Sequence, residues 1–387
     1  MKKEIQIKEL LTRSVEKIYP SKEVFEARLK SEQPLRIYHG IDPTGPTLHI
    51  GHGVELLKLR EFQDLGHHII LLIGDFTAMI GDPTDKTAAR VRQTHEQVLE
   101  NCKHYIEQAG KILDISKIEV RYNSEWLAKM GFNDVLELAA NFTVSQMLER
   151  DMFEKRIQNN EPIYLHEFLY PVMQGYDSVA LNAELETGGN DQTFNMLAGR
   201  TLMARQKKEK FVLSVKLLVD PTGKKMGKSE GNMVTMEDTA ENMFGKVMSW
   251  PDTMMETAFE ICTRVPTEEY KKILEGNPLE AKFTLAAAIT KIYHGDEGAK
   301  AGRDHFSATI QNKEAPTDIP EVSVKIGDAL SEILLAQKLV TSKGEFTRLV
   351  KEGGVQINGE KIHDPFFKIS EPIIVKIGKL RYLKIRV

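Results

Sequence analysis

The spacing of apolar runs between residues 36 and 74 constrains the fold of this chain more than any other feature. Residues 36–41 (RIYHGI) are typical of a buried strand, residues 42–46 form a loop rich in Pro and Gly, and a helix is expected from about 48 to 65. A second apolar run, HIILLIG, follows at residues 68–74. A strand, a helix and a second strand in this order favour parallel pairing with a right-handed crossover.

The alternation of strands and helices continues through the first half of the chain. Apolar runs at residues 118–122 and 210–215 are further strand candidates, and helical stretches at about 133–152 and 172–185 separate them. Residues 5–29 have the pattern of a charged amphipathic helical lead-in. The expected class is therefore α/β, with a doubly wound parallel sheet of the Rossmann-like kind.

The second half of the chain indicates a different organisation. After Met233 the pattern is helical with few strand signals, and residues 312–324 shift to Lys, Glu, Pro, Thr and Asp, which is typical of a linker. We expect a Rossmann-like domain at residues 1–232, an α-helical domain at 233–315 and a small α+β domain at 322–387.

The small last domain should combine two short helices with a hairpin. The helices are expected within residues 324–340 and 344–352. Within residues 355–362, an Asn-Gly pair lies between alternating apolar residues, and this is a strong signal of a tight hairpin turn. Apolar runs at 372–377 and 382–387 complete the domain.

Charge is distributed unevenly along the 387 residues. The net charge is −4, but the segment from Val322 to the C-terminus has 12 basic and 7 acidic residues, a balance of +5 that leaves −9 for residues 1–321. The acidic total argues against a protein devoted to coating nucleic acid. An acidic body with a basic terminal domain instead indicates an enzyme that uses an appended module to hold a polyanion.

The cysteines and the N-terminus indicate a cytoplasmic protein. Cys102 and Cys262 are too few for a disulfide framework and too far apart for the spacing of a zinc knuckle, so we expect no bound metal. The first residues carry acids without a following apolar run of signal length, and no stretch approaches about 18 uncharged apolar residues. We therefore expect neither secretion nor a membrane span.

The first motif, LHIGHG at residues 48–53, lies where the first strand leads into a helix. His49 and His52 share one face of that helix at its positive end, where phosphate groups bind favourably. Gly51 and Gly53 would leave room for a flat base to lie on the helix. A pair of partly exposed histidines remains the alternative, whereas a zinc site lacks a convincing third ligand.

The second motif is DPTGKKMGKS at residues 220–229. Its glycines allow the loop to move, and Lys225 and Lys228 can neutralise charge that builds on a departing phosphate. An ordinary phosphate-binding P-loop is a rival, but three residues separate Gly223 from Gly227 where that motif requires four. A solvated lysine-rich surface loop is the other alternative.

A third group of polar residues lies in YPVMQGYD, residues 170–177. Tyr170, Gln174 and Asp177 are spaced by four and three residues, and this spacing places them on one helix face. They could form only a polar helix surface, although the apolar neighbours indicate that the adjacent faces are buried.

The first two motifs, in this order and on this type of chain, resemble the signature pair of the class I aminoacyl-tRNA synthetases. Residues 49–52 (HIGH) match the first signature in full, and residues 225–229 (KMGKS) match the second with Gly227 where Ser is commonest. With the third group, nearly the whole chain resembles the tyrosyl-tRNA synthetase family. The resemblance implies tyrosine activation by ATP with Mg²⁺, transfer to tRNA(Tyr), no tightly bound cofactor, no covalent enzyme intermediate and a homodimer.

The resemblance also implies roles for individual residues. In that family Tyr38 and Asp177 would bind the substrate phenol, while Tyr170, Gln174 and Asp82 would hold its ammonium group. Gln192 would lie on the tyrosine side of the site. The apolar positions of residues 136–153 would form the dimer contact, although a buried core helix has the same pattern.

Two further groups of residues follow from the resemblance. The ATP and catalytic positions are Gly40, Asp42, Thr44, His49, Gly51, His52, Lys86, Arg90, Asp191, Lys225, Lys228 and Ser229. The last domain is similar to a small RNA-binding domain shared with a ribosomal small-subunit protein, and its expected RNA-binding residues are Lys376, Lys379, Arg381, Lys384 and Arg386. Asn123 also matches a family position, whereas His39 departs from the smaller residue that is usual there.

Three alternative functions stay open at the level of sequence. The tryptophanyl relatives share the fold and both signatures, but they need no phenol-binding pair and usually lack the last domain. A noncatalytic RNA-binding protein could keep a synthetase-like body. A P-loop NTPase would hydrolyse ATP without any amino acid.

Overall fold

The structure is a computed structural model that describes residues 2–31, 33–82, 94–220, 223, 233–311, 319–378 and 381–387. The chain forms two compact units, residues 1–302 and 303–387. Six predicted site residues lie outside the described residues: Lys86, Arg90, Lys225, Lys228, Ser229 and Lys379. The division into three domains therefore stays a prediction, with the helical stretch after residue 233 belonging mostly to the first unit.

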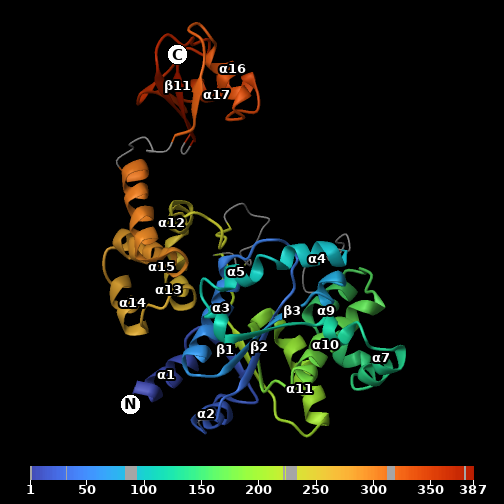
Figure 1. Cartoon of the computed structure of the whole chain (residues 1–387). Coiled ribbons are helices and arrows are strands. Elements are labelled where there is room, and N and C mark those ends of the chain that lie inside the picture. The colour runs from blue at the N-terminus through green and yellow to red at the C-terminus, as the bar shows by residue number, and fades with distance from the viewer. Residues whose placement is uncertain are drawn as a thin grey trace. The chain divides into compact units, whose positions relative to one another are not determined.

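A six-stranded sheet forms the centre of the first unit, in the order β1-β6-β5-β2-β3-β4 (Figure 1). All neighbouring strands are parallel except β1, which runs antiparallel to β6. The strands are β1 (Val15–Tyr19), β2 (Arg36–Ile41), β3 (His68–Ile73), β4 (Ile118–Tyr122), β5 (Leu185–Gly189) and β6 (Phe211–Val215). The expected doubly wound α/β fold is confirmed.

The strand order reverses direction between β2 and β5. From β2 the chain moves through α3 (Ile50–Asp64) to β3 and then to β4, whereas from β5 it moves the opposite way through α11 (Thr193–Arg205) to β6. Because both crossovers are right-handed, their helices cover opposite faces of the sheet. The carboxyl ends of β2 and β5 therefore border a crevice, which is where ligands bind in open α/β sheets.

Helices surround this sheet and continue beyond it. Those of the first half are α1 (Lys2–Leu10), α2 (Lys22–Lys30), α4 (His95–Cys102), α5 (Tyr105–Ala109), α6 (Ser124–Leu127), α7 (Phe132–Ala139), α8 (Val144–Leu148), α9 (Asp151–Gln158) and α10 (Leu165–Ala180). Those after the sheet are α12 (Ala240–Met248), α13 (Met255–Cys262), α14 (Thr267–Leu274) and α15 (Pro278–Phe306). Helix α15 is interrupted at Gly295, where φ is 70°.

Three local predictions for the first unit were wrong. The lead-in at residues 5–29 contains β1, an edge strand whose charged residues hide its pairing with β6. The stretch 133–152 is divided into short helices rather than one. Residues 185–189 (LETGG) form a strand that is buried throughout, although a helix was expected up to 185. Glutamate and glycine are poor strand formers, so tertiary burial overrides propensity there.

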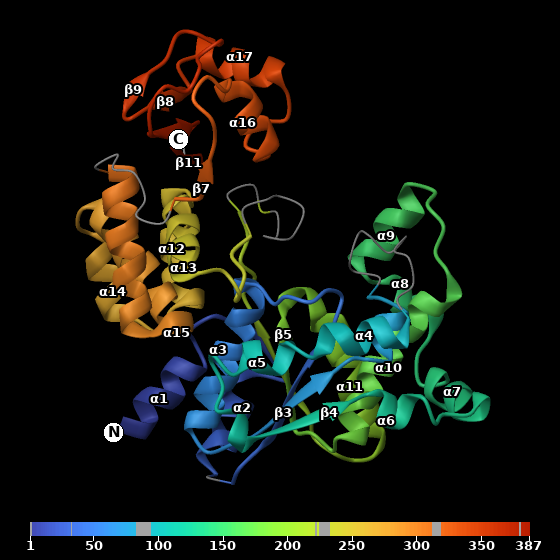
Figure 2. The same ribbon diagram turned by 45° about the horizontal axis from the view of Figure 1, so that its top comes forward.

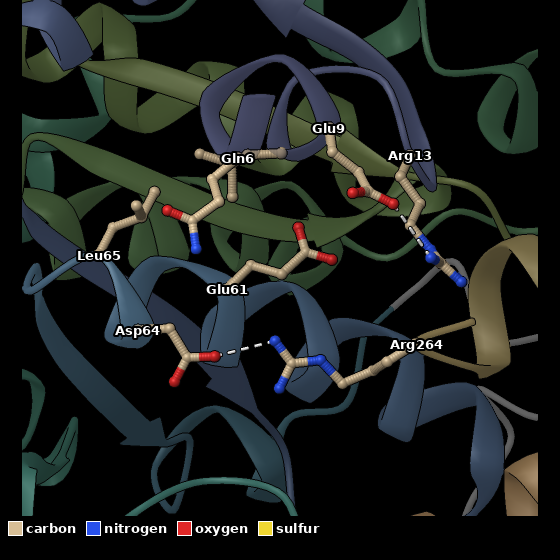
Figure 3. Close-up of a pocket in the computed structure, with 8 residues that line it drawn as sticks. Gln6, Glu9, Arg13, Glu61, Asp64, Leu65 and Arg264 are labelled. Carbon is tan, nitrogen blue, oxygen red and sulfur yellow. Dashed lines mark hydrogen bonds and ion pairs between the residues drawn. The ribbon is translucent and has the colours of Figure 1, made fainter. Parts of the chain in front are cut away.

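The N-terminal helix is joined to the rest of the unit by Arg13. This buried guanidinium donates hydrogen bonds to the backbone carbonyls of Phe259, Glu260, Thr263 and Val265, at 2.6–2.9 Å. Figure 3 shows Arg13 paired with Glu9, and Arg264 paired with Asp64, around a small polar pocket between α1 and α3. Buried charge is stable only when its donors are satisfied, so Arg13 fixes where α13 ends.

The second unit is built on a five-stranded sheet in the order β7-β11-β10-β8-β9 (Figure 2). Its elements are β7 (Glu321–Ser323), α16 (Leu330–Ala336), α17 (Lys343–Lys351), β8 (Val355–Ile357), β9 (Glu360–Lys361), β10 (Ile373–Ile377) and β11 (Arg381–Arg386). The Asn-Gly turn is confirmed: Asn358 and Gly359 have φ values of 49° and 91°, as a tight hairpin requires. Strand β7 lies in the stretch expected to be linker.

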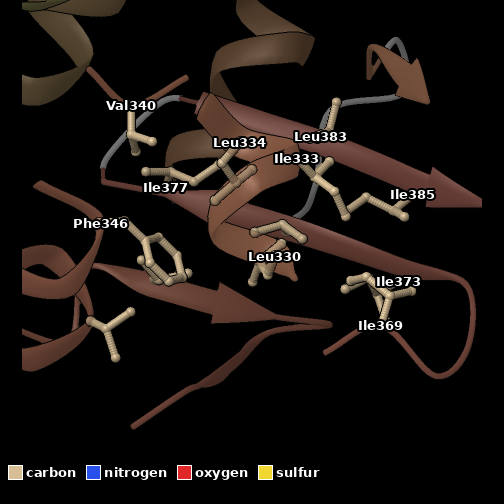
Figure 4. Packing of buried hydrophobic residues seen from close by; sticks show 13 residues of the cluster. Leu330, Ile333, Leu334, Val340, Phe346, Ile369, Ile373, Ile377, Leu383 and Ile385 are labelled. Carbon is tan, nitrogen blue, oxygen red and sulfur yellow. The ribbon is translucent and has the colours of Figure 1, made fainter. Parts of the chain in front are cut away.

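One apolar core holds the second unit together (Figure 4). Phe346 of α17 and Leu330 of α16 are fully buried against Val375 and Ile385 of the sheet. Alternate residues of β10 point inward, as the period of a strand with one covered face requires. Among the described residues, no helix is long and apolar enough to cross a membrane.

Candidate active site

A pocket opens at the carboxyl ends of β2 and β5, at the switch point of the sheet. Its lining comes from these strands, from the start of α3, from the loop after β3 and from α10. The predicted residues that line it are Tyr38, Gly40, Asp42, Thr44, His52, Asp82, Asn123, Tyr170, Gln174, Asp177, Asp191 and Gln192. Residues predicted from separate motifs are thus brought to one place.

The HIGH motif begins helix α3. His49 is the N-cap, and its Nδ1 accepts a hydrogen bond from the amide of Gly51 at 3.1 Å. The Nδ1 of His52 accepts from the amide of His49 at 3.1 Å, and the two rings lie 3.9 Å apart. Because each Nδ1 is an acceptor, the neutral rings carry their protons on Nε2. Two N–H donors therefore sit at a helix N-terminus, where anions bind favourably.

The two glycines of this motif have different surroundings. A side chain at Gly51 would meet the ring of His49 at 2.9 Å, so glycine permits the N-cap geometry. A side chain at Gly53 would meet the hydroxyl of Tyr293 at 2.1 Å. Gly53 therefore lets α3 pack against α15, and the expectation that it makes room for a base is wrong.

Asp42 is half-buried in the pocket wall beside Tyr170. The Tyr170 hydroxyl donates to Oδ2 of Asp42 at 2.7 Å, and the Thr77 hydroxyl donates to Oδ1 at 2.7 Å. Burial raises the pKa of Asp42 to about 7, although both hydrogen bonds oppose the shift. Only glycine fits at position 74, because a Cβ there would lie 1.9 Å from Oδ1 of Asp42.

Asp177 of α10 is held in place by two donors. Trp126 donates its Nε1–H to Oδ1 of Asp177 at 2.8 Å, and the Asn123 amide lies 3.4 Å from Oδ2. Burial raises the pKa of Asp177, against the effect of these two donors. Both carboxylate oxygens are thus fixed in orientation, with Asp177 facing the pocket that it lines.

A buried ion pair lies at the back of the pocket, where Glu186 is one of the lining residues. Lys210 and Glu186 are both almost fully buried, and the Lys210 ammonium contacts Oε2 of Glu186. Burial lowers the pKa of Lys210, and the charge of Glu186 opposes that shift. The Nζ of Lys210 also lies 2.5 Å from Oγ of Ser178, which in turn lies 2.7 Å from the hydroxyl of Tyr38. Burial raises the pKa of Tyr38, so its phenol stays protonated.

Two further pairs of polar residues line the pocket: Gln192 with Asp82, and His39 with Glu55. Gln192 donates its amide N–H to Oδ2 of Asp82 at 2.7 Å, and the buried Arg150 lies 3.8 Å from the same carboxylate. His39, the departure from the family pattern, is buried with Nε2 2.7 Å from Oε2 of Glu55. Burial opposes the charge of His39, but Glu55 outweighs it and the pKa of His39 is raised.

Sequence reasoning missed several of these residues. Four residues that contact and orient other polar side chains belong to no motif: Trp126, Ser178, Glu186 and Lys210. Lys210 ends a charged run, KKEK, that is typical of a solvated loop. In the structure, Lys210 lies against Gly199, where a Cβ would be 2.3 Å from the Nζ of Lys210.

The pocket at the switch point of the sheet, beside the helix that begins with the HIGH motif, agrees with a match to one protein family. Residues 30–311 match the family described as tRNA synthetases class I (W and Y). The chain thus belongs to the class I tRNA synthetases of the tryptophan and tyrosine group.

Curated relatives match almost the whole chain. The tyrosine–tRNA ligase of Carboxydothermus hydrogenoformans is 45% identical, over 97% of this chain and 97% of its own length. That of Thermotoga maritima is 43% identical, over 100% of this chain and 98% of its own. The chain therefore belongs to the tyrosine–tRNA ligase family, and the resemblance inferred from the motifs is confirmed.

Solved structures share the fold at lower identity. A C-terminally truncated mitochondrial tyrosyl-tRNA synthetase from Coccidioides posadasii is 23% identical with a TM-score of 0.64, covering 77% of this chain and 91% of that one. The tyrosyl-tRNA synthetase of Archaeoglobus fulgidus complexed with L-tyrosine is 20% identical with a TM-score of 0.60, covering 78% and 99%.

The carboxyl of Asp42 should titrate near neutrality. Its pKa in the folded chain is about 7 and lies above the value of about 3.9 for an unfolded aspartate, so the folded state holds the proton more tightly. The contribution of Asp42 to stability is therefore greatest below about pH 4 and is lost as pH rises to about 7. A carboxyl ¹³C titration should show a midpoint near 7 that Asp42→Asn removes. A midpoint near 4 would contradict the burial of this carboxyl.

Proposed function

We propose that this chain activates L-tyrosine with ATP to give tyrosyl-adenylate and pyrophosphate, and then transfers the tyrosyl group to the 3′-terminal ribose of tRNA(Tyr). The observation that carries the proposal is the pocket itself. Tyr38 and Asp177 line the same switch-point crevice as His52, from the first turn of the HIGH helix, and this supports the proposal. The family membership supports the same reaction.

Tyr38 and Asp177 would recognise the phenol. Asp177 already receives donors from Trp126 and Asn123, and this fixes its carboxylate as an acceptor toward the pocket. A site that hydrogen-bonds a substrate hydroxyl rejects the analogue without it by about 10⁴–10⁵, because its own polar groups would stay buried and unpaired. This discrimination against phenylalanine would make a separate editing site unnecessary.

The ammonium group of tyrosine would lie beside Tyr170, Gln174 and Asp82. Tyr170 uses its proton on Asp42, so its oxygen remains an acceptor. Gln174 donates its amide N–H to Oε1 of Glu186 at 3.0 Å, so its carbonyl oxygen is likewise an acceptor. Asp82 adds a carboxylate that Gln192 orients. An ammonium group carries three donors, and this wall offers three oxygen acceptors.

ATP would bind along the carboxyl edge of β2 and the start of α3. Thr44 and the Nε2–H donors of His49 and His52 would contact the phosphates, and Asp191 the ribose hydroxyls. Gly40, Asp42 and Gly51 would lie along the nucleotide. Magnesium would arrive with the ATP phosphates as part of the substrate. Lys86, Arg90, Lys225, Lys228 and Ser229, which lie outside the described residues, would act on the leaving pyrophosphate by family resemblance.

The chemistry needs no covalent enzyme intermediate. The tyrosine carboxylate attacks the α-phosphate of ATP, the bond to the β-phosphate breaks, and pyrophosphate leaves. The histidine donors at the start of α3 would stabilise charge that increases as this bond breaks. Catalysis would thus consist of holding two substrates in line and stabilising the departing charge.

The second unit would hold tRNA through its basic surface. The side chains proposed for this contact are those of Lys376, Lys379, Arg381, Lys384 and Arg386. Lys384 lies 3.6 Å from Glu321 of the neighbouring strand, and Arg386 is also paired with Glu321. These two side chains would exchange Glu321 for phosphate oxygens when RNA binds, which makes the affinity sensitive to salt.

A homodimer would explain the apolar side chains left exposed in the first unit. Phe132, Leu136 and Val144 are 79%, 52% and 68% exposed, and Leu165 at the start of α10 is 79% exposed. Leu136 is therefore not part of a buried core helix, whereas Phe153 at the end of the predicted segment is fully buried. Large apolar side chains left exposed are typical of an interface.

We also propose that the chain works in the cytoplasm. Cys102 and Cys262 are free and buried, as expected of a protein in a reducing compartment.

Replacing Asp177 should remove the preference for tyrosine. In Asp177→Ala the phenol loses a buried acceptor and Tyr38 loses its counterpart, so the ratio of kcat/KM for tyrosine over phenylalanine should fall by about 100-fold or more. ATP–pyrophosphate exchange with each of the twenty amino acids measures this directly. Asp64→Ala, on the surface of the same unit, is the control. Exchange driven by another amino acid, or by none, would overturn the proposed function.

Removing residues 319–387, which include the whole sheet of the second unit, should separate the two chemical steps. A chain that ends at residue 318, before β7, should form tyrosyl-adenylate at nearly the rate of the whole chain, because the tyrosine pocket lies within residues 38–196. Aminoacylation of tRNA at physiological salt should fall sharply. Equal charging by the shortened and whole chains would show that this unit does not hold the tRNA.

Sedimentation should detect a dimer at micromolar concentration. Leu136→Asp places a charge in the proposed contact and should shift the protein to monomer. The exposed Ile326→Asp, in the second unit, is the matched control and should leave the dimer intact. A monomer without any substitution would contradict the proposed interface.

A further inference from the structure

The ion pair at the back of the pocket touches both ends of the proposed tyrosine site. Glu186 of β5 lies between Gln174, on the ammonium side, and Lys210, which precedes β6. Lys210 reaches Ser178 of α10, and Ser178 contacts Tyr38 on the phenol side. Helices α10 and α11 pack closely enough here that only glycine fits at position 199.

The direction of each hydrogen bond in this network follows from Lys210. An ammonium group has three donors and no acceptor. Its three hydrogens are matched by three acceptors: Oε2 of Glu186, Oγ of Ser178 at 2.5 Å and the carbonyl of Met196 at 3.0 Å. Ser178 must therefore accept from Lys210, and its own hydrogen is left to donate elsewhere.

The nearest acceptor for that hydrogen is the Tyr38 oxygen, 2.7 Å from Oγ of Ser178. If Ser178 donates to Tyr38, then Tyr38 does not spend its proton on Ser178. Tyr38 lines the pocket, and the Glu186 carboxylate also accepts a hydrogen bond from its hydroxyl, so an oxygen bound in the pocket would compete with Glu186 for this proton. Asp177, which receives two donors of its own, remains the acceptor for the substrate hydroxyl.

We propose that Lys210 and Ser178 are positioning residues that make Tyr38 a hydrogen-bond donor to the substrate phenol. The phenol oxygen then accepts from Tyr38 while its proton goes to Asp177. Glu186 has the same effect at the other end, because a carboxylate repels the carbonyl oxygen of Gln174 and accepts only its N–H. One buried ion pair thus presents a donor to the phenol and an acceptor to the ammonium group. This inference rests on the proposed function and deepens its account of the same pocket.

Ser178→Ala tests the network with the smallest change. It removes one fully buried hydroxyl and leaves the ion pair in place. Tyr38 then loses the donor that sets its direction, and kcat/KM for tyrosine should fall about 10-fold while that for phenylalanine and the KM for ATP stay the same. The ratio of the two amino acids in ATP–pyrophosphate exchange is the readout. Ser214→Ala, an equally buried serine of β6 outside the pocket, should leave the ratio unchanged.

A second variant covers the case in which Ser178→Ala is poorly folded. Lys210→Met combined with Glu186→Gln removes both charges together, so neither is left buried alone. It should lower the tyrosine to phenylalanine ratio at least as much as Ser178→Ala does. A purely structural role would reduce both amino acids equally and keep the ratio constant, and this result in either folded variant would overturn the inference. Failure of the unaltered chain to use tyrosine would instead refute the proposed function.

Discussion

β2 and β5 are adjacent strands, and the chain leaves them in opposite directions along the sheet. This reversal opens a crevice between their carboxyl ends, and the site depends on that crevice. Neither helix can cover the carboxyl edge between these strands, because α3 and α11 lie on opposite faces. The HIGH motif sits at the amino end of the first crossover helix, and Asp191 and Gln192 precede the second. The residues proposed as phosphate donors and those proposed to contact the amino acid are therefore brought together by the topology of the sheet.

Polar side chains that enter such a crevice must be held by others, since each carries a cost when it is buried without a partner. Asp42 is held by Tyr170 and Thr77, and Asp177 by Trp126 and Asn123. Behind them the Lys210–Glu186 pair satisfies its own charges and, through Ser178 and Gln174, orients the groups that face the pocket. Apolar packing also holds this network, because the ring of Tyr38 lies in a buried cluster with Ile70 and Leu72. Fixed orientation, more than affinity of any single contact, gives such a site its selectivity.

The sequence was sufficient to predict the parts of this arrangement that depend on local pattern. Apolar runs located β2, β3, β4 and β6, the Asn-Gly pair located the hairpin at Asn358, and the motifs led to the residues that line the pocket. Sequence patterns were insufficient where tertiary burial outweighs the local preference of the residues for a strand or for solvent. Residues 185–189 contain a glutamate and two glycines, yet form a central strand. Lys210 follows three charged residues and appears solvent-facing, and only the gap left by Gly199 allows it inside.

A crystal structure of the chain with L-tyrosine tests the central claim most directly. The account predicts that the phenolic oxygen lies within about 3.2 Å of both the Tyr38 hydroxyl and the Asp177 carboxylate. It also predicts the ammonium group beside Tyr170, Gln174 and Asp82, with the carboxylate directed toward the start of α3. Tyrosine bound in the reverse orientation, or outside the crevice between β2 and β5, would contradict it.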